Sequence, residues 1–258
     1  MTKKSGLAQN FYLGGYNLSG DTGAGNEIGG GLAGTQDITG IDKSAFERKG
    51  LLRDGRLSWT SFFNPEKATD IPGTTEDKAH AVLSSLPTTD RHMMWATGTA
   101  IGAPAACMVG KQIDYNPSRA ADGSLTIAVA GQANGFGLEW CDLLTAGVRT
   151  DTTGTSGTSL DLGTGSTAFG LQLYLHVFAL TGTSVTVKLQ ESGDNGAGDA
   201  WADVTGGAFV AATGISAQRI QTGRTQTVER YLRVVTTGTF TNAKFAVAVN
   251  RNPVRVDF

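Results

Sequence analysis

The stretch Leu171-Gln172-Leu173-Tyr174-Leu175-His176-Val177-Phe178 decides the fold class of this chain. Its aliphatic residues recur at every second position, which is the period of a strand buried on one face. The same period returns in three later stretches, at residues 185–190, 228–234 and 245–249. Such strands, separated by glycine-containing turns, predict an antiparallel β-sandwich in this part of the chain.

The composition extends this β assignment to the whole chain. The 258 residues include 36 glycines and only 6 prolines, and 40% of them are hydrophobic. Each glycine inside a helix costs about 1 kcal/mol relative to alanine, so this composition disfavours long helices. The length is compatible with two modest domains or with one large all-β domain.

A change in composition marks the expected domain boundary. Residues 150–165 consist almost entirely of threonine, glycine, serine and aspartate, as in a linker or an exposed loop. We therefore expect a first domain at residues 1–150, a linker at 151–165 and a second β-sandwich domain at 166–258.

The first domain is predicted to be a β-sandwich or barrel with one short flanking helix. Residues 11–20 predict a strand, a tight turn and a second strand, and the glycine-rich residues 21–34 predict a flexible loop. Asp54-Gly55 predicts a hairpin turn that leads into an alternating strand at 56–61. The remaining expected elements are β structure at 37–45, a loop at 64–77, a helix at 78–86, strands at 92–97, 105–115, 124–132 and 137–141, and a hairpin turn at 121–124.

Charge and targeting signals exclude several classes of protein. The 21 basic and 23 acidic residues give a formal net charge of −2, which provides no basic field for binding nucleic acid. Lys3 and Lys4 are followed by no apolar run, so no signal peptide is expected, and no stretch approaches the 18 apolar residues of a membrane span. The protein is expected to fold in a cytosol, with Cys107 and Cys141 as buried, reduced thiols.

No motif indicates catalysis. His80, His92 and His176 lack metal-ligand spacing, and no serine nucleophile elbow is present. Residues 29–34 match Gly-x-Gly-x-x-Gly but lack the flanking strand and helix that a dinucleotide site requires. Residues 192–199 lack the ligand spacing of a calcium loop. We therefore expect no enzyme activity, no catalytic, cofactor-binding or metal-binding residue, and no cofactor.

Two stretches resemble known virion proteins. Residues 11–21 (Phe-Tyr-Leu-Gly-Gly-Tyr-Asn-Leu-Ser-Gly-Asp), followed by Asp37-Ile38-Thr39, by residues 45–48 and by residues 52–59 (Leu-Arg-Asp-Gly-Arg-Leu-Ser-Trp), resemble major tail proteins of phages and prophages, especially those of actinobacterial hosts. His80-Ala81-Val82-Leu83 matches the pattern of that family's small helix. Residues 201–209 and 229–234 resemble a β-sandwich domain that is appended to many virion proteins.

The resemblance implies a subunit of a tail tube, built from stacked hexameric rings through which DNA passes into the host. It implies that residues 1–150 build the tube and 166–258 decorate it, and that the segments Met1–Gln9 and 21–34 become ordered on assembly. The loop at 64–77 would bridge rings or subunits. The implied partners are other copies, the tape measure, tail terminator and distal tail proteins, and host-surface glycans. DNA would pass through the lumen without specific binding, and no membrane insertion is implied. The implied location is the virion tail, with assembly in the bacterial host cytoplasm.

Two other functions stay open at this point. A capsid decoration or accessory protein would share the appended sandwich without the polymerising first domain. A carbohydrate-binding module would use Trp201, Tyr231 and Tyr174 as a surface on which sugars stack.

Overall fold

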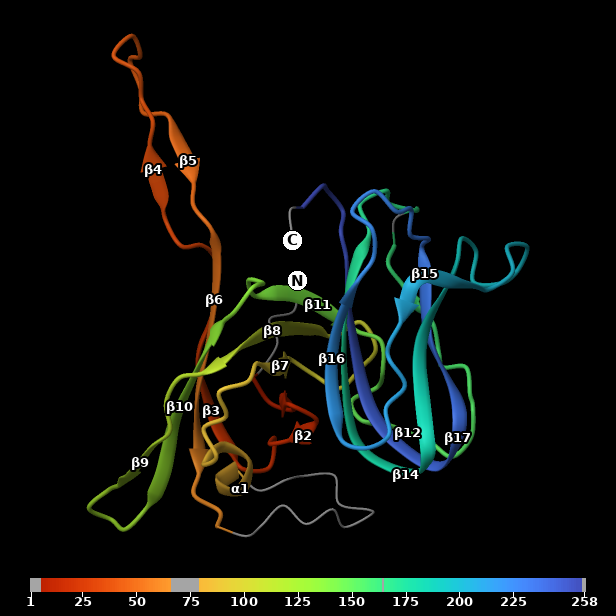
Figure 1. The fold of residues 1–258 in the computed structure, drawn as a ribbon, viewed down its shortest axis with the longest axis horizontal. Coiled ribbons are helices and arrows are strands. Elements are labelled where there is room, and N and C mark those ends of the chain that lie inside the picture. Colours follow the sequence, from red (N-terminus) through yellow and green to blue (C-terminus); the bar gives the residue numbers. More distant parts are fainter. Residues whose placement is uncertain (1–5, 66–78, 164, 257–258) are drawn as a thin grey trace.

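A computed structural model describes residues 6–65, 79–163 and 165–256, which form two β-rich lobes lying side by side (Figure 1). The fold is mainly β, with antiparallel pairing, as the sequence predicts. The strands of the first lobe are Asn10–Leu13 (β1), Tyr16–Asn17 (β2), Thr22–Leu32 (β3), Thr35–Asp37 (β4), Arg48–Gly50 (β5), Arg53–Phe62 (β6), Arg91–Ala96 (β7), Pro104–Gln112 (β8), Asn116–Arg119 (β9), Leu125–Ala133 (β10) and Glu139–Leu143 (β11). The helix Ala79–Leu83 (α1) packs its Ala79, Val82 and Leu83 inward.

The second lobe is built around two very long strands. Its strands are Arg149–Asp151 (β12), Leu160–Asp161 (β13), Leu171–Ser192 (β14), Ala202–Ala208 (β15), Ser216–Gln221 (β16) and Tyr231–Arg251 (β17). β14 and β17 pair along nearly their whole length, with register shifts around Gly182. The stretches predicted as separate strands at 171–178 and 185–190 are therefore parts of one bent strand. In the same way, β17 is one strand that contains most of the strand predicted at 228–234 and all of the strand predicted at 245–249.

Two glycines allow this long pair of strands to bend. Gly182 and Gly238 have φ angles of 139° and 125°, which side-chain-bearing residues rarely adopt. A Cβ at Gly182 would also collide with the backbone of Phe240. The bent ladder encloses one apolar core, which includes Leu173, Val187 and Phe245.

The two lobes share both a sheet and a core. The strand order β15-β14-β17-β11-β8-β10-β6-β3 runs through both of them, and β11 is the link because Asp142 and Leu143 pair with Val249 and Ala248 of β17. A distinct apolar cluster spans the junction and includes Tyr12 from β1, Cys107 from β8 and Phe178 from β14. The junction is thus packed on several strands.

The segment expected to be a linker lies along β17. β12 and β13 each pair with β17, and Asp161 forms a bidentate ion pair with Arg230, with both N···O distances at 2.7 Å. The backbone N–H of Thr236 donates to Thr155 O at 3.0 Å. The domain limits 1–150 and 166–258 stay a prediction.

The prediction of a flexible loop at residues 21–34 is wrong. Most of this segment is β3, which pairs with β6 from Thr22↔Ser61 to Leu32↔Arg53. The glycines leave room for large neighbours, because a Cβ at Gly25 would lie 2.7 Å from Trp95 and one at Gly30 would lie 2.7 Å from Leu138 Cβ. Tertiary packing therefore overrides the low strand propensity of glycine.

The predicted hairpin turn at Asp54-Gly55 is also wrong. Both residues lie inside β6, and Gly55 is buried against the backbone of Leu138, where a Cβ would come within 2.6 Å. The strand that follows is confirmed, since Leu57, Trp59 and Ser61 are buried while Arg56 is exposed.

Other predictions divide between confirmation and correction. The turn at Gly14-Gly15, the hairpin between β9 and β10 and the strands at β7, β8, β10 and β11 are confirmed. β structure at 37–45 is wrong beyond Asp37, because residues 38–47 form the turn between β4 and β5. Residues 66–77 of the expected loop, and residues 1–5 of the N-terminal arm, lie outside the described residues.

Candidate assembly interface

A long hairpin arm extends beyond the sheet of the first lobe. β3 and β6 continue into the β4–β5 ribbon, which projects away from both lobes (Figure 1). The tip carries the apolar side chains Ile38, Ile41 and Phe46, of which Ile41 is fully exposed and Phe46 is 70% exposed. Arg48 lies over the Phe46 ring, with 4.9 Å between the guanidinium carbon and the ring centroid. Large apolar groups in water at the end of such an arm are typical of a binding surface.

A groove of about 760 Å³ lies at the base of this arm. Its walls are the arm base, the β10–β11 connection with the start of β11, the connection between β16 and β17, and the segment after β17. The lining residues are Leu32, Leu51, Leu52, Arg53, Ala133, Gly135, Phe136, Gly137, Glu139, Arg224 and Val256. Leu52 is 85% exposed, so the groove presents apolar surface to solvent.

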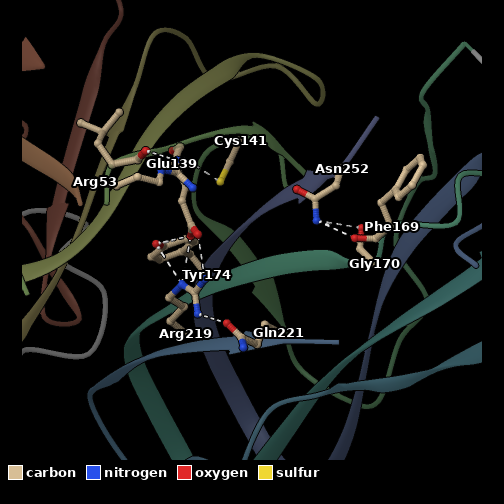
Figure 2. Close-up of polar contacts among 10 residues, drawn as sticks. Arg53, Glu139, Cys141, Phe169, Gly170, Tyr174, Arg219, Gln221 and Asn252 are labelled. Carbon is tan, nitrogen blue, oxygen red and sulfur yellow. Dashed lines mark hydrogen bonds and ion pairs between the residues drawn. The ribbon is translucent and has the colours of Figure 1, made fainter. Parts of the chain in front are cut away.

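A buried ionic network joins the lobes (Figure 2), and its Glu139 also lines the groove. Glu139 from β11 accepts hydrogen bonds from Arg219 Nη2 at 2.7 Å and from Arg219 Nε at 2.9 Å, and both side chains are 3% exposed. Tyr174 from β14 donates its hydroxyl to Glu139 Oε2 at 2.6 Å. Three elements that are far apart in the sequence are therefore fixed by one carboxylate.

The network extends to the groove wall through Phe136. The guanidinium carbon of Arg219 lies 3.8 Å from the centroid of the Phe136 ring. Burial lowers the pKa of Arg219, but hydrogen bonds and the charge of Glu139 outweigh burial and raise it above its ordinary value. Burial and the neighbouring Glu139 charge also raise the pKa of Tyr174. Arg219 therefore stays cationic and Tyr174 stays a proton donor, so the network is structural in character.

The three histidines have different surroundings. His80 Nδ1 lies 2.5 Å from the Tyr115 hydroxyl, on the side of the first lobe. His176 is fully buried and its Nδ1 accepts the backbone N–H of Gly15 at 3.2 Å. Burial, together with the positive charges of His92 and Arg91, lowers the pKa of His176 to about 3. Burial likewise lowers the pKa of His92.

The two cysteines are buried free thiols, which confirms the prediction. Burial and the nearby Cys107 raise the pKa of Cys141, which keeps its thiol protonated. Among the described residues, no group of three histidine, cysteine or acidic side chains is placed to hold a metal ion. The described residues also contain no helix that is long and apolar enough to cross a membrane.

The two glycine-rich motifs occupy different structures. Residues 29–32 lie in β3 beside β6, and the next element is the strand β4 and not a helix. At 192–199 the Asp194 carboxylate accepts backbone N–H groups from Ala197, Gly198 and Asp199, so the loop's own backbone uses those oxygens.

The sugar-stacking surface of Trp201, Tyr231 and Tyr174 is not assembled. Tyr174 is fully buried in the Glu139 network. Arg233 lies over the Trp201 ring at 4.3 Å from its centroid, and Arg230 lies over Tyr231 at 4.9 Å. Among the described residues, the most exposed aromatic side chains are elsewhere, at Phe46 on the arm and at Trp140 and Phe62 on the first lobe.

Comparisons with known proteins do not show which family this chain belongs to. No family model matches the sequence, and no curated protein matches it closely enough to count as a relative. Among solved structures, the Dit protein of phage SPP1 has a TM-score of 0.31 and 11% identity over 95% of this chain and 100% of its own. Chains in two structures of the activated phage p2 baseplate, with strontium and with calcium, have TM-scores of 0.32 and 0.30. Both are 9% identical over 95% of this chain and 99% of theirs. At these values the likeness assigns no function to this chain.

Proposed function

We propose that this chain is the tail tube subunit of a long-tailed bacteriophage, a structural virion protein that forms stacked hexameric rings around a channel for DNA. The observation that carries the proposal is the projecting arm, whose apolar tip stands away from both lobes (Figure 1). A subunit that functions alone gains nothing from exposing such a tip, whereas a subunit of a polymer buries it against a neighbour.

The sheet edge supports the same proposal. β3 ends the strand order of the main sheet among the described residues, and its side chains are mostly exposed. Exposed edge strands are templates for pairing with another chain, and closure into a ring removes them. The resemblance of residues 11–21 and 52–59 to major tail proteins agrees with this arrangement.

The two lobes have different proposed roles. Residues 1–150 include the arm and the edge strand, and they build the tube wall. Residues 166–258 decorate the exterior, where host-surface glycans are candidate ligands. The remaining partners are the tape measure, tail terminator and distal tail proteins. DNA passes through the lumen without specific binding, consistent with a net charge of −2.

Negative-stain microscopy of the purified full chain tests this function. Tubes with a regular ring repeat and a central channel are the expected result. Monomers or trimers that never polymerise, and that bind capsids when mixed with them, would instead identify a capsid accessory protein.

A further inference from the structure

We propose that the junction between the two lobes is an acid-sensitive hinge, in which His92 of β7 and His176 of β14 are the groups that bind protons. Protonation of these histidines would separate the lobes at the junction while each lobe stays folded. A free subunit has the same junction as an assembled one, so the hinge does not depend on the proposed tube.

The two histidines come from opposite lobes and lie where the lobes pack together. His176 is fully buried, and its ring centroid is 6.0 Å from that of Tyr12 in the first lobe. His92 lies on β7 of the first lobe, and β7 contacts β16 of the second. The positive charge of His92 acts on His176, so the two side chains belong to one electrostatic cluster that spans the junction.

One hydrogen bond across the junction requires a neutral His176. Its Nδ1 accepts the backbone N–H of Gly15 at 3.2 Å, so the neutral ring carries its proton on Nε2. A second proton would convert Nδ1 from an acceptor into a donor that faces the Gly15 N–H. Protonation of this histidine therefore breaks a contact that joins the first lobe to the second.

The cluster already contains positive charge. Arg91 on β7 opposes protonation of His176, and Arg219 on β16 opposes protonation of His92. Three buried nitrogen atoms, Arg91 Nε, Arg91 Nη2 and His176 Nε2, have no hydrogen-bond partner among the described residues. An added proton would thus enter a buried site that is rich in donors, where an unpaired charge is costly.

The carboxylates near the cluster are already paired. Asp90 acts on His92, but it forms an ion pair with Lys111 at 2.7 Å. Glu139 forms its ion pair with Arg219, also at 2.7 Å. The other titratable side chains around the cluster are tyrosines and cysteines, which are neutral in acid, namely Tyr12, Tyr16, Tyr174, Cys107 and Cys141. Among the described residues, no free carboxylate therefore offsets a proton on either histidine.

The junction can open without disrupting the core of either lobe. Val187 belongs to the apolar cluster of the second lobe and Trp59 to that of the first, whereas Cys107 and Phe178 belong to a separate cluster at the junction. Within the described residues, the backbone pairing that joins the lobes is that of the end of β11 with β17. Local opening at such a junction requires less free energy than unfolding of the whole chain.

Acid shifts the equilibrium toward the open junction. Burial and the neighbouring positive charges lower the pKa of His176 to about 3, and burial also lowers the pKa of His92. Both values return toward about 6.5 when water reaches the rings, so below pH 6.5 the open state binds more protons. The closed junction is fully favoured above pH 6.5. Between pH 8 and pH 5, His176 alone raises the opening equilibrium roughly 30-fold.

Thiol labelling of the full chain tests the hinge, because Cys107 and Cys141 are buried in the junction cluster. Dithiodipyridine reacts with thiols in acid, and its rate with N-acetylcysteine at each pH corrects for its own pH dependence. The corrected rate should be about tenfold or more higher at pH 5 than at pH 8, while far-UV circular dichroism stays native. Val187→Cys, combined with Cys107→Ala and Cys141→Ala, reports on the second-lobe core and should show no such acceleration.

A histidine variant decides whether the two rings are the trigger. His92→Gln combined with His176→Gln should remove most of the acceleration at the native cysteines. Full acceleration in this variant, equal acceleration at Val187→Cys, or no acceleration in the wild type would each overturn the hinge. If circular dichroism at pH 8 shows that the double histidine variant is unfolded, His176→Gln alone replaces it. Val228→Cys replaces Val187→Cys on the same criterion, because Val228 belongs to the same cluster.

Discussion

Glu139 and Arg219 form a bidentate ion pair inside the protein although 80 residues separate them in the sequence. The pair joins β11 to β16 and also orders Tyr174 and Phe136, so one contact holds both lobes and one wall of the groove. Removal of the cation would leave a buried carboxylate with the Tyr174 hydroxyl but without an opposite charge, which is among the costly changes that a single substitution makes.

Arg219→Met is therefore expected to lower the free energy of unfolding by about 3–5 kcal/mol. Adding Glu139→Met to Arg219→Met removes the orphaned charge as well, and most of that stability should return. Urea denaturation of both variants and the wild type measures the effect. A double variant no more stable than Arg219→Met would contradict the assigned role of the carboxylate.

Acid should destabilise the protein through His176. Its pKa is about 3 in the folded state, against about 6.5 in an unfolded chain, so below pH 6.5 the unfolded state binds the extra proton. Stability is fully present above pH 6.5 and decreases as the pH falls toward 3. Between pH 6.5 and 5 this one group costs about 2 kcal/mol.

His176→Gln removes that proton while keeping an acceptor for the Gly15 N–H. Urea unfolding at pH 8 and at pH 5 should show a smaller loss for this variant than for the wild type, with His92 still contributing. Identical losses of stability in the two proteins would show that the pKa of His176 is the same in the folded and the unfolded state.

Two adjacent glycines provide a matched test of β3. A Cβ at Gly30 would lie 2.7 Å from Leu138 Cβ, whereas one at Gly29 meets only the flexible Glu27 carboxylate at 3.3 Å. Gly30→Ala should lower the free energy of unfolding by about 1–3 kcal/mol through overpacking, and Gly29→Ala should be nearly neutral. Equal effects in thermal unfolding would mean that β3 does not pack on Leu138.

The arm tip should matter for assembly and not for folding. Ile41→Asp combined with Phe46→Asp places two charges on exposed side chains, so the melting temperature of the subunit should stay within about 2 °C of the wild type. Sedimentation should show loss of polymers, while Val210→Asp on the second lobe should leave them intact. Polymers that survive the tip variant would exclude the tip from the interface.

Local patterns in the sequence predicted most of the strands. The alternation of Leu57, Trp59 and Ser61 reports burial on one face directly, and it is confirmed. The same reasoning failed at Gly25, Gly30 and Gly55, because Trp95 and Leu138, which occupy the space above them, come from distant parts of the chain. A glycine that accommodates a neighbour is indistinguishable from a turn glycine in a single sequence.

The candidate interface was not predicted for a related reason. Ile38, Ile41 and Phe46 are the apolar residues of an otherwise polar stretch, and that contrast was the available signal. Their exposure depends on the β4–β5 ribbon standing clear of both lobes. The pairing of Glu139 with Arg219 depends on the β11–β17 and β14–β16 registers, which no local pattern specifies.

Negative-stain microscopy of the wild-type chain, alone and purified, tests the central claim most directly. The account predicts tubes with a regular ring repeat and an open central channel. Particles that stay monomeric or trimeric at every concentration, and that bind capsids, would contradict it.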